Sequence, residues 1–159
     1  MPRQNRCAAA PDQIDRISIT THPRWLSVCN IKAPETGLEA KFSYAQTAAM
    51  RLVGHDTGAI ASFTDAICRD KAVKALRGLV KVVEDDRLAE TEAEVSLKMR
   101  NGALRRLKHD LMAPMPLAQR AEKLGAKAVS LLGDARADAL WSAAQGRDLR
   151  DLMDQLVMS

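Results

Sequence analysis

The stretch APETGLEAKFSYAQTAAMRLVG, residues 33–54, decides most of what the sequence predicts about the fold. From Phe42 to Val53 the apolar residues recur every three or four positions, which is the period of a helix with one apolar face. Gly54 follows the last of them, where a helix commonly ends. The sequence therefore predicts one helix over residues 39–53, with a narrow, alanine-lined face that can approach a neighbouring element closely.

The start of this helix carries the candidate binding residues. Thr36 can cap the first turn, and Gly37 permits a close backbone approach or a positive φ. Lys41 adds a positive charge, and Ser43 and Tyr44 add hydroxyl groups. Because first-turn N–H groups have no partner within a helix, a carboxylate ligand could bind at this corner. The alternative is an ordinary helix cap with a solvent-exposed lysine, and the residue pattern alone leaves both interpretations open.

Upstream of this stretch, IDRISIT at residues 14–20 alternates apolar and polar side chains. This pattern predicts a strand with a register shift in its middle, ended by His22-Pro23. Residues 1–13 show no consistent period and are predicted to form a flexible tail.

Downstream, Thr64 and Asp70 are predicted N-caps of two short helices, the second ending near Arg77 before Gly78. Asn101-Gly102 stands between alternating segments, which predicts a hairpin with a type I′ turn. Strands are predicted at residues 79–85, 93–100 and 103–108, and helices at residues 117–132, 134–144 and 147–157. The fold class is α+β: a small antiparallel sheet, a meander with the Asn-Gly hairpin, packed against helices in one domain over residues 14–159.

Composition narrows the class of protein. The chain has 159 residues, of which 47% are hydrophobic, as in an ordinary soluble domain. No window approaches about 18 consecutive apolar residues, so no membrane-spanning helix and no membrane partner are expected. An apolar signal-peptide core is lacking. Cys7, Cys29 and Cys68 are odd in number and far apart, which favours reduced thiols and a cytoplasmic location.

Other chemistry has little support in the sequence. The net charge is +4, but only LRRLKH at residues 104–109 is locally basic, and no aromatic residues for base stacking lie nearby, so nucleic acid is not an expected partner. His22, His55 and His109 form no ligand pair, and we predict neither a metal nor a cofactor. The acidic run at residues 84–86 is interpreted as a solvated strand end rather than a cation site.

The motifs of this chain resemble the MmgE/PrpD family. In that family a P-x-T-G-x-E-A-K-F-S run opens a helix of the second domain, and this chain has it from Pro34 to Ser43. An F-T-D/E element follows, matched by Phe63–Asp65. A D/N-G turn between strands is matched by Asn101-Gly102, and a later Lys-apolar pair by Lys123-Leu124. The order and spacing agree from about residue 14 to the C-terminus.

The resemblance implies a function. Family members include 2-methylcitrate dehydratase, cis-aconitate decarboxylase and iminodisuccinate epimerase, which act on small polycarboxylic acids without a metal or organic cofactor. The implied chemistry is proton abstraction next to a carboxylate, catalysed by a lyase or isomerase that is a homo-oligomer.

Members of the family are about three times longer and carry a helical N-terminal domain, whereas this chain resembles only the smaller C-terminal or lid domain. We therefore expect a fragment or a truncated gene product, inactive without the helical partner domain. The alternative is a stand-alone, non-enzymatic α+β module that binds a carboxylate ligand or a protein.

Overall fold

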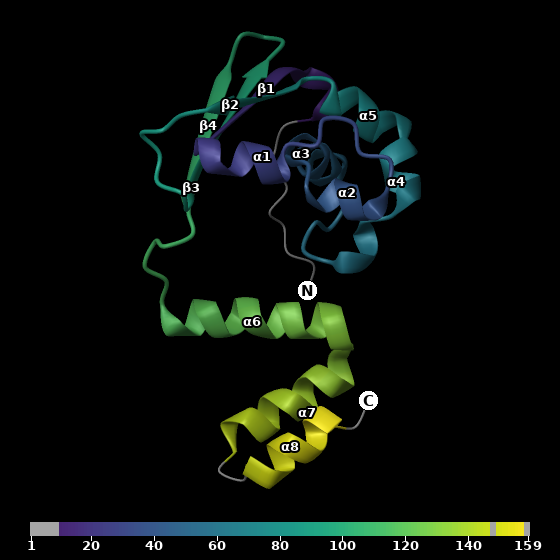
Figure 1. The fold of residues 1–159 in the computed structure, drawn as a ribbon, viewed down its shortest axis with the longest axis vertical. Coiled ribbons are helices and arrows are strands. Elements are labelled where there is room, and N and C mark those ends of the chain that lie inside the picture. The colour runs from purple at the N-terminus through teal and green to yellow at the C-terminus, as the bar shows by residue number, and fades with distance from the viewer. Residues whose placement is uncertain (1–9, 147–148, 158–159) are drawn as a thin grey trace. The chain divides into compact units, whose positions relative to one another are not determined.

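The structure is a computed structural model that describes residues 10–146 and 149–157. The described residues fall into two compact units, and each is considered separately. The first unit holds the residues up to Thr57 and Ala61–Ala113, and the second holds Gly58–Ile60 and the residues from Pro114 onwards. The α+β fold class predicted from the sequence is confirmed, with a four-stranded sheet and packed helices in the first unit (Figure 1).

The sheet is mixed, so the predicted antiparallel meander is wrong. Its strands are β1 (Ile14–Thr21), β2 (Val80–Glu84), β3 (Glu92–Met99) and β4 (Leu104–Asp110), in the order β2-β1-β3-β4. β1 lies between β2 and β3, parallel to the first and antiparallel to the second. A parallel pair needs a crossover of a dozen or more residues, and the helices between β1 and β2 supply it.

Short helices make up this crossover. They are η2 (Pro23–Trp25), α1 (Leu26–Cys29), α2 (Gly37–Lys41), α3 (Tyr44–Val53), η3 (Ile60–Ser62), α4 (Asp65–Arg69) and α5 (Lys71–Arg77). Thr64 caps α4 and Asp70 caps α5, as predicted, through side chains that accept from the N–H groups of Ile67 and Val73. The sequence analysis missed η2 and α1, which are each a single turn.

The helix predicted over residues 39–53 is in fact two helices, α2 and α3. Ser43 is extended (φ −128°), and its Oγ accepts from the N–H of Gln46 at 3.2 Å, which begins α3 afresh. The carbonyl of Phe42 accepts from the N–H of Ile31 at 3.1 Å instead of continuing a helix. Gly54 ends α3 with φ of 109°, which confirms its predicted place.

The hydrophobic core lies on one face of the sheet. Ile17 of β1 and Leu97 of β3 point into it, and Met50 of α3 and Val73 of α5 cover them. The amide of Gln46 is buried among these residues, where its Nε2 donates to the carbonyl of Ile67 at 3.3 Å. A buried polar group needs such a partner.

The turn between β3 and β4 differs in detail from the prediction. The two strands pair antiparallel, with Lys98 opposite Leu104. Gly102 has a φ of 86°, but Asn101 does not have a positive φ, so the type I′ turn is wrong. β1 does carry a register shift, between Ile14 and Arg16, at its start rather than its middle.

The second unit is helical. It contains α6 (Leu117–Leu132), α7 (Asp134–Gln145) and α8 (Leu149–Val157), close to the predicted helices. Residues 147 and 148, the predicted start of the last helix, lie outside the described residues. Among the described side chains of these three helices, only Ala137 and Ala143 are buried. This unit therefore has almost no core of its own.

The N-terminal segment is described only in part. Residues 1–9 of the predicted tail lie outside the described residues, and η1 (Pro11–Gln13) is a turn of 3-10 helix that leads into β1. Across the described residues, no helix is long and apolar enough to cross a membrane. Cys29 and Cys68 are free thiols.

Candidate functional site

The predicted site residues lie around α2, where two motifs distant in the sequence meet. Gly37 is buried, and its N–H donates to Oδ1 of Asp65 at 2.7 Å. A Cβ added to Gly37 would overlap the carbonyl oxygen of Phe63. Only glycine lets the two backbones approach this closely. Gly37 therefore serves close approach, the first of its two predicted roles, and its φ is not positive.

The first turn of α2 is closed by side chains of this chain. Thr36 Oγ1 accepts from the N–H of Glu39 at 3.2 Å, and Oε2 of Glu39 accepts from the N–H of Thr36 at 3.1 Å. This reciprocal pair is a capping box. Oε2 of Glu39 also accepts from the N–H of Glu35 at 2.7 Å, and these backbone hydrogen bonds lower the pKa of the Glu39 carboxyl.

These contacts occupy backbone donors at the start of α2. The N–H groups of Thr36, Gly37 and Glu39 are not open to a ligand, because Asp65 and the capping box already use them. Helix α2 also has only five residues. Positive charge for a ligand therefore has to come from a side chain.

Lys41 is the predicted residue that can supply this positive charge. It is the last residue of α2, it is exposed, and it makes no hydrogen bond or ion pair with any described residue. An exposed ammonium can hold a carboxylate as a point charge. The described contacts bring no second titratable group to Lys41, so this position offers charge rather than a general base.

Ser43 and Tyr44 have mainly structural contacts. Ser43 is buried, at 1% exposure, and caps α3. Tyr44 is half-buried and packs against the hydrophobic core. Burial raises the pKa of the Tyr44 hydroxyl, and a hydrogen bond with Thr21 partly offsets that effect. Of the five predicted residues, Thr36 and Ser43 cap helices, Gly37 permits a close backbone approach and Tyr44 packs against the core. Lys41 offers an exposed charge.

The sequence analysis missed three residues that hold this region together: Glu39, Asp65 and Cys68. The thiol of Cys68 donates to the carbonyl of Thr36 at 3.3 Å, and burial raises the pKa of this thiol. A Thr at the cap followed three residues later by Glu could have identified the capping box. The contact of Asp65 with Gly37 spans 28 residues and has no local signal.

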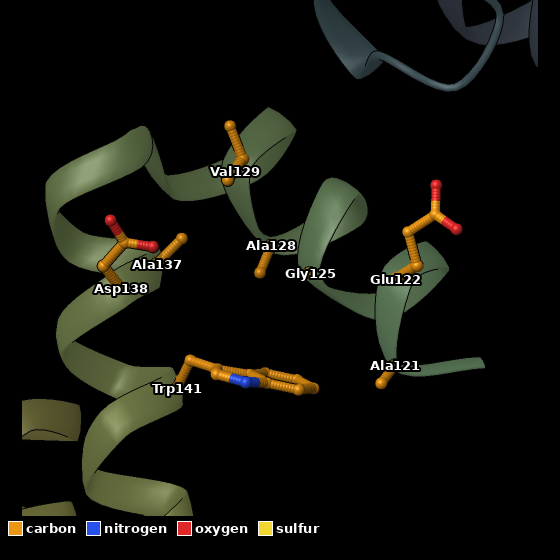
Figure 2. A pocket seen from close by; sticks show the side chains of 8 residues that line it. All are labelled: Ala121, Glu122, Gly125, Ala128, Val129, Ala137, Asp138 and Trp141. Carbon is orange, nitrogen blue, oxygen red and sulfur yellow. The ribbon is translucent and has the colours of Figure 1, made fainter. Parts of the chain in front are cut away.

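Three hollows in the described residues were considered as ligand sites, and none is lined by the five predicted residues. One of about 370 Å³ lies between α6 and α7 (Figure 2). Its indole, from Trp141, faces Gly125 and Ala128, and its charged residues, Glu122 and Asp138, are both acidic. Its lining residues therefore offer no cation to an anionic substrate.

The other two hollows belong to the first unit. One of about 620 Å³ lies at the carboxyl ends of β1 and β2 and is lined by Glu84, Asp85 and Asp86. Its one cation, Arg87, pairs with Asp85 at 2.7 Å and holds the pKa of that carboxyl at about 2. The third, of about 440 Å³, is lined mainly by apolar residues, and its charged lining residues are Asp12 and Arg100.

A metal site was the other kind of site considered from the sequence. Within the described ranges, no group of three or more His, Cys, Asp or Glu side chains could hold a metal ion.

Comparison with known families gives a match. A model of the MmgE/PrpD C-terminal domain matches residues 3–140. No curated protein matches the chain significantly. The matched range contains the whole sheet, both motifs that meet at Gly37, and α6.

Proposed function

Because the chain belongs to the MmgE/PrpD family, as its C-terminal domain, we propose that it forms part of a lyase or isomerase acting on a small polycarboxylic acid. The reaction is proton abstraction next to a carboxylate, without a cofactor. A helical domain of the same family, on this chain or another, supplies the catalytic base. The observation that carries this proposal is the match over residues 3–140.

The contribution of this chain to the site is electrostatic. At the start of α2, the carboxylates of Glu39 and Asp65 accept hydrogen bonds from backbone N–H groups of the matched motif. At the end of α2, Lys41 is exposed. A lysine so placed binds one carboxylate of the substrate and stabilises the negative charge that develops on proton removal. Proton transfer itself needs a positioned base, which the described contacts of Lys41 do not include.

The test has two parts. The purified chain is assayed with 2-methylcitrate, cis-aconitate and iminodisuccinate, alone and with the helical domain of a family member added. We expect no turnover by the chain alone. Turnover by the chain alone, lost in Lys41→Ala, would contradict the division of labour between the two domains.

The second part concerns Lys41. In a full-length family member, replacing the matching lysine by alanine should lower kcat/KM by about 10²-fold, as expected for one lost preorganised electrostatic contact. Lysine to alanine at the position matching Lys71 is the control, because Lys71 is exposed on α5 and is not part of the motif. If the two variants fall equally, or both stay within about threefold, Lys41 is only a solvated residue.

A further inference from the structure

The face of the sheet opposite the core is strongly basic. The register places four side chains in one row across all four strands: Lys81 on β2, Ser18 on β1, Ser96 on β3 and Arg106 on β4. Residues paired across strands point to the same face. Both charged ends of this row are exposed, whereas the alternate residues Ile17 and Leu97 are buried in the core.

The neighbouring rows add further cations. Arg16 pairs with Lys98 in the row on one side, and in the row on the other side Thr20 pairs with Glu94, which pairs with Lys108. We call the five basic residues of these three rows the basic face. They are Arg16, Lys81, Lys98, Arg106 and Lys108.

The basic face carries an excess of positive charge over its three rows. Glu94 is the one acidic residue in these rows. Removing the five cations and this carboxylate from the 24 basic and 20 acidic residues of the chain leaves 19 of each. The next row on this face, in which Glu92 pairs with Asp110, is acidic, so the excess of positive charge is confined to these three rows.

Only part of this charge is paired within the part of the chain that the structure describes. Lys98 Nζ lies 3.6 Å from a carboxylate oxygen of Asp15, and Lys108 Nζ lies 2.9 Å from one of Glu92 and 3.9 Å from one of Glu94. Among the described residues, no ion pair involves Arg16, Lys81 or Arg106. Lys81 and Arg106 flank Ser18 and Ser96 in one row, and Arg16 lies in the neighbouring row. The hydroxyl groups of the two serines can hydrogen-bond to a ligand.

We propose that the basic face binds an acidic, extended segment of a partner protein. Charge complementarity identifies the partner as an anion. Rows of one sheet face recur every two residues, about 6.7 Å, which is also the spacing of alternate side chains on one side of an extended peptide. A segment with Asp or Glu at alternate positions can therefore meet successive rows of cations.

Single-stranded nucleic acid is the less suitable polyanion. Such ligands are held by bases stacked on aromatic side chains as well as by charge. The three rows of the basic face contain no aromatic residue. The binding surface is also distinct from Lys41, which belongs to the motif at α2, so the two proposals can fail independently.

The experiment uses the full chain and two probes of equal charge: a synthetic peptide of alternating glutamate and serine, and a single-stranded oligonucleotide. Charge reversal in Lys81→Glu/Arg106→Glu should raise the Kd of the peptide at low ionic strength by about tenfold or more. The matched control, Lys32→Glu/Lys71→Glu, makes the same change of net charge at exposed residues away from the face and should alter the Kd less than about twofold.

Each result decides the proposal. Tight peptide binding that weakens only in the face variant supports it. Equal loss in both variants shows attraction by net charge alone and overturns it, as does an absence of peptide binding or tighter binding of the oligonucleotide. Circular dichroism checks the fold, and if charge reversal disrupts the sheet, Lys81→Gln/Arg106→Gln replaces it with an expected change of about threefold.

Discussion

Gly37 is the residue at which two parts of the family motif meet. Its N–H reaches Asp65, and its missing side chain makes room for the carbonyl of Phe63. Gly37→Ala forces the two backbones apart, and we expect a loss of about 1–3 kcal/mol in the free energy of unfolding. Chemical denaturation monitored by circular dichroism measures it.

A second glycine in the same unit is the control for that substitution. A Cβ at Gly78 would make ordinary van der Waals contact, and Gly78 has helical backbone angles. Gly78→Ala should therefore be neutral or stabilise the fold by up to about 1 kcal/mol. If Gly37→Ala is as mild as Gly78→Ala, the close approach at Gly37 is not a constraint on the fold.

The two described thiols should differ in reactivity. Cys68 is 3% exposed, donates to the carbonyl of Thr36, and has a pKa raised by burial. Cys29 is only half-buried. Because alkylation needs an accessible thiolate, iodoacetamide should label Cys29 at least about tenfold faster than Cys68. Peptide mapping by mass spectrometry measures both rates, and equal labelling of the folded chain would contradict the described packing.

At the scale of elements, Ser43 decides that residues 37–53 form two helices. Its buried Oγ accepts from the N–H of Gln46, and its backbone bridges Asn30. Ser43→Ala leaves that N–H buried without its partner, so we expect a loss of about 1–2 kcal/mol in the free energy of unfolding. Ser27→Ala, at an exposed hydroxyl in α1, should change it by less than about 0.5 kcal/mol. Losses of equal size would show that Ser43 does not act as a cap.

At the scale of the whole molecule, the second unit exposes large apolar side chains. In the second unit Leu117 is 80% exposed, Leu124 is 55% exposed and Leu149 is 72% exposed. Leu117 and Leu124 are seven residues apart and therefore lie on the same face of α6. Exposed apolar patches mark interfaces. We expect the purified chain to bind a hydrophobic dye and to self-associate, and we expect the helical partner domain to reduce both.

A double substitution on α6 tests whether the dye binds to the exposed leucines of this helix. Leu117→Gln/Leu124→Gln should lower dye fluorescence by about half, because it removes two exposed leucines from α6. Lys123→Gln is the control on the same helix and should leave it unchanged. A chain that is strictly monomeric by light scattering and binds no dye would contradict the expectation.

Local patterns in the sequence determined the individual elements. Alternation identified β1 and β3, and the caps Thr64 and Asp70 marked the starts of α4 and α5, because each signal depends on residues within one or two turns of each other. The motif around residues 34–43 identified the family. It also drew attention to Lys41, whose role in binding remains a prediction.

Only the tertiary structure decided which elements are neighbours. β1 pairs with β2 across more than fifty residues of chain, and Asp65 reaches Gly37 from another helix. Neither the strand pairing nor the Asp65 contact can be predicted from the local pattern, because the period of a strand specifies its buried face and not its partner. The break at Ser43 has the same origin. A serine within a helical pattern is ambiguous until Asn30 and Ile31 pair with the backbone beside it, and that pairing needs the folded chain.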